Sequence, residues 1–145
     1  MNKKGFSLVE LIVVIAIMAV LLGVIAPSLF VQVENARAQR DTSAMSEVGS
    51  AIRNGMLKDP VYDEALLLVN SDGIITLLFS PKNGIVYFGE TENLGEKMRD
   101  ELRSVIGDSV KLSSRTYKSG EYDYQVIIDM NFPGAHVSYD WVKHS

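Results

Sequence analysis

MNKKGFSLVELIVVIAIMAVLLGVIAPSLFVQV, residues 1–33, decides how this chain is organised. Lys3 and Lys4 precede an apolar stretch whose one charged side chain is Glu10. The uncharged run from Leu11 to Val33 would span about 34 Å as an α-helix, enough to cross a hydrocarbon core of about 30 Å. A carboxylate at the bilayer centre costs roughly 2.5–3.5 kcal/mol, so we expect Glu10 to have a specific role.

Composition limits the rest of the protein. With 145 residues, the chain has room for one ordinary domain and an extended helix. Cysteine is absent, which excludes disulfides and thiolate metal sites. The formal net charge is −4, and loss of the two lysines with residues 1–5 would make it −6 (12 basic and 18 acidic side chains). This acidic balance argues against nucleic-acid binding through bulk electrostatics.

Two ordinary explanations of the apolar segment are a secretory signal peptide and a passive single-pass anchor. A signal peptide should end in a small-x-small cleavage site, but here Ile25-Ala26-Pro27 follows the apolar core. An anchor explains everything except Glu10. In either membrane-spanning case, the basic residues before the segment predict a cytoplasmic N-terminus and an outward-facing remainder.

The stretch Gly5-Phe6-Ser7-Leu8-Val9-Glu10-Leu11 offers a third explanation. A short basic leader that ends in glycine, then phenylalanine, a small hydroxyl residue, two aliphatic residues, glutamate and an aliphatic run resembles the class III signal of type IV pilins and pseudopilins. Pro27 also stands where type IV pilins commonly carry a proline. The resemblance is close over roughly the first 30 residues and covers only the general plan of the remainder.

The resemblance implies a defined order of processing and assembly steps. A prepilin peptidase would cleave between Gly5 and Phe6 and methylate the new amine of Phe6. On assembly, Glu10 would pair with the Phe6 amine of a neighbouring subunit in a helical filament. Other implied partners are membrane lipid before assembly, an inner-membrane platform protein and an assembly ATPase; no cofactor is implied.

A structural subunit of a type IV pilus is the first functional hypothesis, and a major pseudopilin of a type II secretion or competence system is the alternative. Adhesion, motility, DNA uptake and secretion stay open as roles. A membrane-anchored enzyme or binding module is the hypothesis outside this class. The absence of cysteine departs from the many pilins with a disulfide near the C-terminus, so no disulfide-bound loop is carried over.

The helix is predicted to continue beyond the apolar segment and to end between Gly55 and Pro60. Gly23 and Pro27 weaken it locally, which predicts a kink and a stretchable segment from residue 23 to residue 27. One apolar face follows three- and four-residue steps: Ala44, Met45, Val48, Ala51, Ile52 and Met56. The opposite charges are predicted to form a solvated face: Glu34, Arg37, Asp41, Glu47 and Arg53.

Later segments read as a small α+β head. Residues 61–69 fit a helix or a strand, residues 74–79 and 85–88 fit strands after turns at 70–73 and 81–84, and residues 91–106 fit an amphipathic helix ended by Gly107. Residues 111–118 are expected to form a strand ahead of a hairpin. The hairpin joins alternating residues 122–130 to residues 137–141 through Phe132-Pro133-Gly134.

The predicted fold is therefore α+β and pilin-like, with a long N-terminal helix packed on a small antiparallel sheet. Its parts are a leader at 1–5, an apolar helix half at 6–33 that is transmembrane before assembly, and a head at 34–145 that includes the second half of the helix.

Catalytic motifs are absent: the sequence has no HExxH, no P-loop and no GxSxG. His136 and His144 are predicted to be exposed rather than metal ligands. Asp123, Asp129 and Asp140 could share one hairpin face and bind a hard cation, although solvent-facing charges are the plainer expectation. The tyrosines at 117, 122 and 124 could form an adhesive patch, but sheet aromatics usually pack in a core.

Overall fold

The fold is that of a computed structural model, in which residues 5–144 are described. Lys3, Lys4 and the first four positions of the predicted leader lie outside the described residues. The chain divides into two units, Met1–Ala36 and Arg37–Ser145. One helix contributes to both units, and each unit is described by itself.

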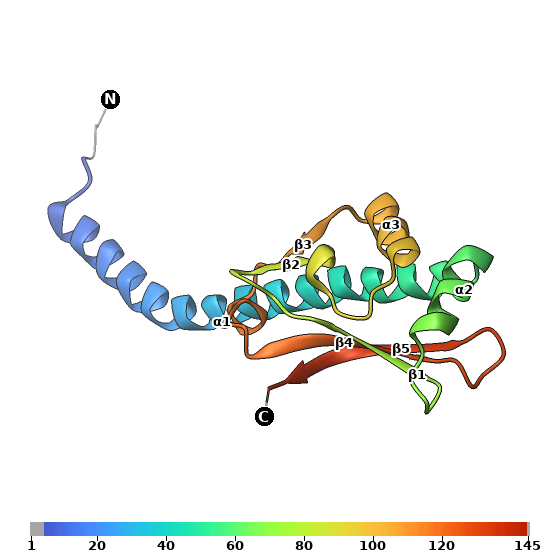
Figure 1. The fold of residues 1–145 in the computed structure, drawn as a ribbon. Helices are drawn as coiled ribbons and strands as arrows, with labels where there is room; N and C mark the ends of the chain where they lie inside the picture. Colours follow the sequence, from blue (N-terminus) through green and yellow to red (C-terminus); the bar gives the residue numbers. More distant parts are fainter. Residues whose placement is uncertain (1–4, 145) are drawn as a thin grey trace. The chain divides into compact units, whose positions relative to one another are not determined.

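Helix α1 (Leu8–Gly55) is the longest element and ends within the predicted range (Figure 1). It is helical through Gly23 and Pro27, although proline cannot donate a backbone hydrogen bond to the carbonyl of residue 23. The Ser28 hydroxyl donates to the Ile25 carbonyl at 3.0 Å, a local bond inside the same turn. The kink and the stretchable segment stay predictions.

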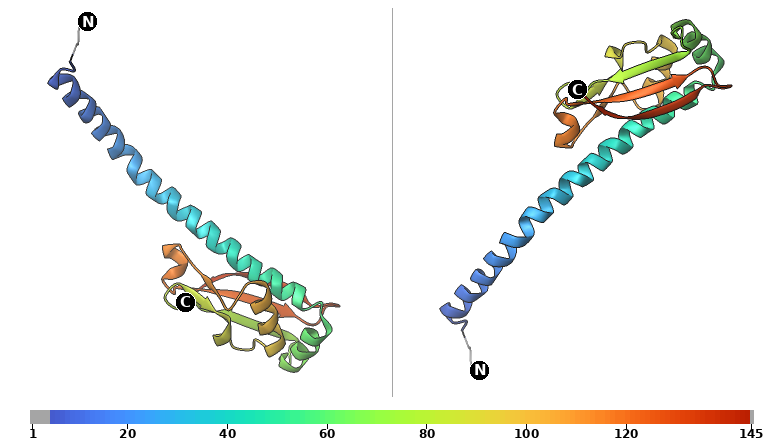
Figure 2. Two further views of the ribbon diagram at one scale, coloured as in Figure 1. Left: turned by 90° about the horizontal axis from the view of Figure 1, so that it is seen from above. Right: turned by 90° about the horizontal axis from the view of Figure 1, so that it is seen from below.

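In the second unit, the C-terminal part of α1 packs on a three-stranded antiparallel sheet (Figure 2). The strand order is β1 (Ile74–Phe79), β4 (Tyr122–Asp129) and β5 (His136–Lys143). The bounds of β1 and the terminal hairpin confirm the predicted alternation, because Tyr124, Val126 and Ile128 all point into the core. The α+β class and the helix-on-sheet packing are likewise confirmed.

Shorter elements complete the head. The ambiguous segment is a helix, α2 (Asp59–Leu68), with Pro60 in its first turn, where the missing N–H costs nothing. Strand β2 (Ile85–Tyr87) leads into a 3-10 turn, η1 (Phe88–Glu90), which shortens the predicted strand by one residue. The amphipathic helix is α3 (Glu96–Val105), followed by Gly107 at φ 109°.

The predicted strand over residues 111–118 is wrong. Strand β3 (Ser109–Lys111) lies earlier in the sequence and pairs with β2, outside the three-stranded sheet. Residues Arg115–Lys118 instead form a one-turn helix, α4. Its N-cap is Ser114, whose side-chain oxygen accepts a hydrogen bond from the Tyr117 amide at 3.3 Å.

Asp41 also differs from its prediction, because it is not on a solvated face. Only 1% of its surface is exposed. Its carboxylate accepts hydrogen bonds from the Ser113 amide (2.8 Å to Oδ1), the Ser113 hydroxyl (2.9 Å to Oδ1) and the Ser114 amide (2.7 Å to Oδ2). The segment before α4 is thereby tied to α1, which ends β3 before it could extend.

The other charges of that face have different outcomes. Glu47 is exposed, as predicted. Arg53 is exposed, but its side chain also contacts the sheet. Its guanidinium donates to the Val137 carbonyl at 2.9 Å and lies 5.5 Å from the Tyr139 ring centroid. Glu34 is half-buried and Arg37 is exposed, and each has an interaction partner.

Gly49 lets the helix approach the sheet closely. A Cβ atom at this position would lie 2.3 Å from Cδ1 of Tyr139, and the Tyr139 hydroxyl is 3.4 Å from the Ser50 hydroxyl. Because the Arg53 guanidinium also packs over the Tyr139 ring, the ring cannot move aside without losing contacts. The side-chain-free surface of Gly49 therefore sets the distance between α1 and β5.

We predict that Gly49→Ala lowers the stability of the head by about 1–3 kcal/mol, the usual cost of overpacking. The full-length protein in detergent micelles should show a lower midpoint of chemical denaturation. Gly23→Ala is the matched control, since it also adds a methyl group to α1 but meets no atom within 4 Å. Equal midpoints for both variants would contradict the packing described for Gly49.

Candidate processing and assembly site

The start of α1 carries a hydrogen bond that the sequence analysis did not anticipate. The Ser7 amide donates to Oε2 of Glu10 at 2.9 Å, and the Leu11 amide donates to the Ser7 carbonyl at 3.2 Å. Serine at the N-cap and glutamate three residues later form the sequence pattern of a capping box. The S-x-x-E spacing could have revealed this arrangement before the structure did.

This bond gives Glu10 a role within the single subunit. An N-terminal turn of a helix leaves amide groups without partners, and its dipole favours a negative charge. The Glu10 carboxylate provides both a hydrogen-bond acceptor and a negative charge at the N-terminus of α1. It uses Oε2 for the Ser7 amide, which leaves Oε1 for a second donor.

Gly5 and Phe6 precede the helix and are exposed, Phe6 to 85% of its surface. A side chain at position 5 would meet no atom within 4 Å, so the fold itself does not require glycine there. The bond between them lies in a non-helical, accessible segment. A peptidase could bind such a segment without first unwinding α1.

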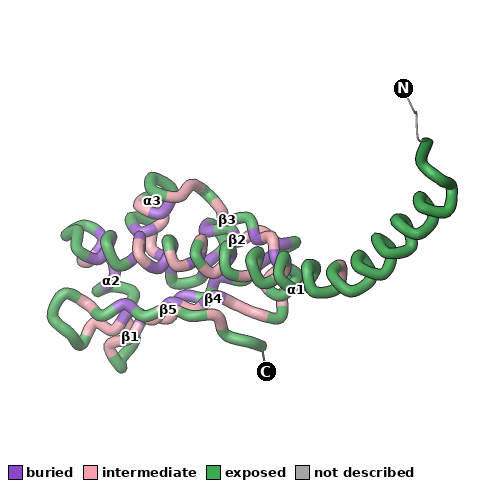
Figure 3. The backbone as a smooth tube through the Cα atoms, turned by 180° about the vertical axis from the view of Figure 1, so that it is seen from behind, coloured by how far each residue is buried: buried purple, intermediate pink, exposed green. Residues whose placement is uncertain are grey.

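The large apolar residues of α1 from Leu8 to Val33 are exposed in the single subunit, and Figure 3 colours this part of the helix almost entirely as exposed. The most apolar window of 18 residues has a mean hydropathy of 3.1, and none of it is buried within the structure. A core helix of a soluble protein would be mostly buried, so length, composition and exposure together indicate a helix suited to lipid or to other subunits.

Residues 1–26 match the family model of the prokaryotic N-terminal methylation motif. The chain carries a class III signal peptide. This motif is characteristic of type IV pilins and pseudopilins, and it points to a structural subunit processed by a prepilin peptidase and handled by an assembly machinery. No curated protein and no solved structure matches the chain.

The three aspartates considered as cation ligands share a face of the hairpin but do not come together. Asp140 lies opposite Gln125, and Asp123 and Asp129 are six residues apart on β4, about 20 Å. Each carboxylate has its own local partner: His144 for Asp123, Asn131 for Asp129 and the Trp141 amide for Asp140. Among residues 5–144, no three potential metal-ligating side chains of His, Cys, Asp or Glu converge.

Both histidines are exposed, as predicted. His144 Nε2 lies 2.9 Å from Oδ2 of Asp123, and the His136 ring is 6.0 Å from that of Phe132. Each histidine therefore has a local partner, Asp123 for His144 and Phe132 for His136.

The tyrosines form a packed cluster rather than an exposed patch. The Tyr117 ring stacks on Trp141, with centroids 4.0 Å apart and 10° between the planes. Tyr122 meets Tyr117 edge-on at 5.7 Å, and Tyr124 meets Trp141 edge-on at 5.3 Å. Tyr124 is buried, and burial raises the pKa of its hydroxyl well above the usual value.

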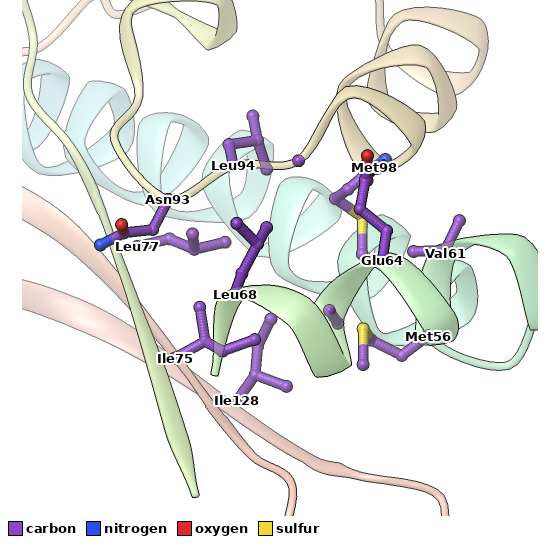
Figure 4. Close-up of a pocket in the computed structure, with 12 residues that line it drawn as sticks. Met56, Val61, Glu64, Leu68, Ile75, Leu77, Asn93, Leu94, Met98 and Ile128 are labelled. Carbon is purple, nitrogen blue, oxygen red and sulfur yellow. Dashed lines mark hydrogen bonds between the residues drawn. The ribbon is translucent and has the colours of Figure 1, made fainter. Parts of the chain in front are cut away.

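The cavity between α2, α3 and β1 is too small for a substrate. It holds about 20 Å³, roughly the space of one water molecule, and its walls are mostly apolar (Figure 4). Glu64 on its rim accepts hydrogen bonds from the Lys97 amide (2.8 Å) and the Met98 amide (3.4 Å). It thereby caps α3, whose N-cap residue, Gly95, has no side chain.

Proposed function

We propose that this protein is the structural subunit of a type IV pilus, which polymerises through α1 after its leader is removed. The observation that carries the proposal is the exposed apolar surface of α1, with a single carboxylate at its first turn, inside a methylation motif. Such a surface is stable in lipid and equally stable against copies of itself, because lipid and aliphatic side chains are similar solvents.

The proposed sequence of events follows from these two environments. The subunit enters the cytoplasmic membrane with its N-terminus inside, as the basic leader favours. A prepilin peptidase cleaves between Gly5 and Phe6 and methylates the Phe6 amine. The platform protein and the assembly ATPase then move the subunit into the filament, where the head reaches the cell surface.

Glu10 would change partners at this step. In the single subunit its carboxylate caps α1 through the Ser7 amide. In a filament core, water is excluded and a lone carboxylate would be costly, so the Phe6 amine of a neighbouring subunit is the natural counter-charge. This pairing would favour one axial register of the subunits over others.

We predict that mass spectrometry of the mature protein from its native host shows loss of residues 1–5 and one methyl group on the Phe6 amine. Gly5→Arg should block both changes, and it tests the peptidase rather than the fold, since a Cβ atom at position 5 would meet no atom within 4 Å. An intact N-terminus in the wild type, or cleavage after Ala26, would contradict the proposal.

Electron microscopy of material sheared from cells separates the first candidate from the alternative. A pilus subunit should appear in long surface filaments that an antibody against the head decorates. A pseudopilin of a type II secretion or competence system would give a processed N-terminus without long sheared filaments.

A further inference from the structure

The two edges of the three-stranded sheet differ in how they are protected. Strands β1 and β5 are the edge strands, and an open edge can pair with another extended chain. The outward residues of β5 are Val137, Tyr139, Trp141 and Lys143, and every second one has a bonded backbone group. The Val137 carbonyl accepts a bond from the Arg53 guanidinium (2.9 Å), and the Trp141 amide donates to the carboxylate of Asp140 (2.7 Å).

The β1 edge keeps the outward backbone groups of two consecutive outward residues available. The Met130 amide donates to the Gly73 carbonyl at 2.9 Å, in the same register as the pairing of Ile74 with Asp129. In an antiparallel pair, hydrogen-bonded and non-hydrogen-bonded residues alternate. The N–H and C=O groups of Ile74, Thr76 and Leu78 therefore point away from β4.

Ile74 already has local partners, since its amide donates to the Asp72 carboxylate (3.3 Å) and its carbonyl accepts from the Asn70 amide (3.4 Å). Within residues 5–144, the outward backbone groups of Thr76 and Leu78 have no such partner. These two residues are where an added strand would pair.

A groove of about 280 Å³ lies beside this edge. It extends from Thr76 in β1 to Ser80, the residue after the strand, about 13 Å at strand spacing, which suits an extended segment of about four residues. The segment from Tyr87 to Asn93 forms the opposite wall. The lining residues are Thr76, Leu78, Ser80, Lys82, Tyr87, Glu90, Thr91, Glu92 and Asn93.

The walls specify what kind of segment would fit. Lys82 pairs with Glu90, so Glu92 carries the unbalanced charge of the groove. Leu78 and Tyr87 are 46% and 43% exposed and offer apolar surface between the polar groups. An occupant should therefore be extended, carry a basic side chain for Glu92, and alternate it with aliphatic residues.

We propose that this groove binds an extended basic segment of a partner protein by strand addition to β1. A second copy of this chain is a poorer occupant. Its β5 edge is interrupted, because Arg53 and Asp140 each bond one of its backbone groups, and pairing of two β1 edges would bring both Glu92 side chains to the same seam. The proposal does not depend on filament formation.

The test uses the full-length protein in detergent micelles and a fluorescent peptide, Thr-Val-Lys-Val-Thr-Val, followed by fluorescence anisotropy. We expect saturable binding with a dissociation constant below about 1 mM. Three control peptides are compared with this peptide. Two are methylated on alternate backbone amides, one in each of the two phases, and the one whose methyl groups face β1 should bind at least about tenfold more weakly, a loss of roughly 1.4 kcal/mol or more. The third has glutamate in place of lysine and should also bind at least about tenfold more weakly.

Protein variants locate the site. Leu78→Pro removes an outward N–H without breaking the β1–β4 ladder, and it should weaken binding by about tenfold or more. Lys143→Pro is the matched control, because its N–H points outward from the other edge and binding should be unchanged. Glu92→Gln should weaken binding about threefold at low salt, with the difference lost at high salt.

Circular dichroism establishes whether each variant is folded. If Leu78→Pro is not folded, Glu92→Gln and the methylated peptides still test the proposal. Three outcomes overturn the proposal: no saturable binding, equal binding of the unmethylated and both methylated peptides, or a loss with Lys143→Pro equal to that with Leu78→Pro. Maltotetraose is included as a competitor. If it binds the groove and the peptide does not, the site is for carbohydrate.

Discussion

A Glu10→Val variant should reach the membrane and lose its leader, yet leave cells without filaments. Valine removes the acceptor for the Ser7 amide and the counter-charge proposed for the Phe6 amine. An unpaired ammonium group in an apolar filament core costs several kcal/mol, and each 1.4 kcal/mol lowers the equilibrium of subunit addition about tenfold. We therefore expect filament yield to fall by about a hundredfold or more, measured by immunoblots of sheared and membrane fractions.

Glu10→Gln separates the two roles of this side chain. Glutamine can still accept the hydrogen bond from the Ser7 amide, as it does in other capping boxes, but it carries no charge. If pairing with the Phe6 amine governs assembly, the glutamine variant should fail like the valine variant. Wild-type filament yield from Glu10→Gln would instead show that capping of α1 is the role that matters.

The second large effect concerns Asp41. Replacing it with alanine should lower the stability of the head by about 3 kcal/mol, because the Ser113 and Ser114 amides would lose a charged partner in a largely buried setting. Chemical denaturation of the full-length protein in micelles measures this change. Glu47→Ala, an exposed position on the same helix, should stay within about 0.5 kcal/mol of the wild type.

The Asp41 carboxylate should also make stability depend on pH. Burial by itself would raise its pKa, but the hydrogen bonds from Ser114 and Ser113 together outweigh burial and lower the pKa below the ordinary 3.8. The stabilisation is thus present above pH 3.8 and is lost as the pH falls through the lower folded-state pKa. The stability difference between wild type and Asp41→Asn should shrink on acidification below about pH 4; a constant difference would contradict this account.

Much of the architecture followed from local patterns. The alternation in residues 122–130 and 74–79 predicted β4 and β1 because each strand buries one face, and the α1 stripe ended where Gly55 and Pro60 weaken a helix. The segment at 61–69 was ambiguous because short apolar runs fit either periodicity. The structure shows a helix there, and Pro60 is compatible with its first turn because a proline at that position loses no helical hydrogen bond.

The errors came from contacts between distant residues. Asp41 was placed with the solvated charges because it is acidic, although its spacing of four and seven residues from Met45 and Val48 puts it on the core face. Its partners are 72 and 73 residues further along the chain, and no local pattern reveals them. The same pairing ends β3 and starts α4, so both errors have one cause.

At the processing site, the motif predicted which residues matter but not their arrangement. The resemblance explained Glu10 through a second subunit, and the capping box was overlooked because a complete explanation already existed. The structure adds that the same carboxylate serves the isolated helix.

The unequal edges of the sheet have a consequence for polymer growth. A monomer must have two reactive ends to build a chain, and among residues 5–144 the three-stranded sheet has one uninterrupted edge, since Arg53 and Asp140 each bond a backbone group of β5. In step-growth polymerisation, a monomer with one reactive group ends the chain once it has reacted. In the same way, strand pairing at this head would end after a single added strand. In the proposed filament, neighbouring heads could each acquire a strand but would not fuse into a continuous sheet, which agrees with the proposed lengthening of the filament through α1.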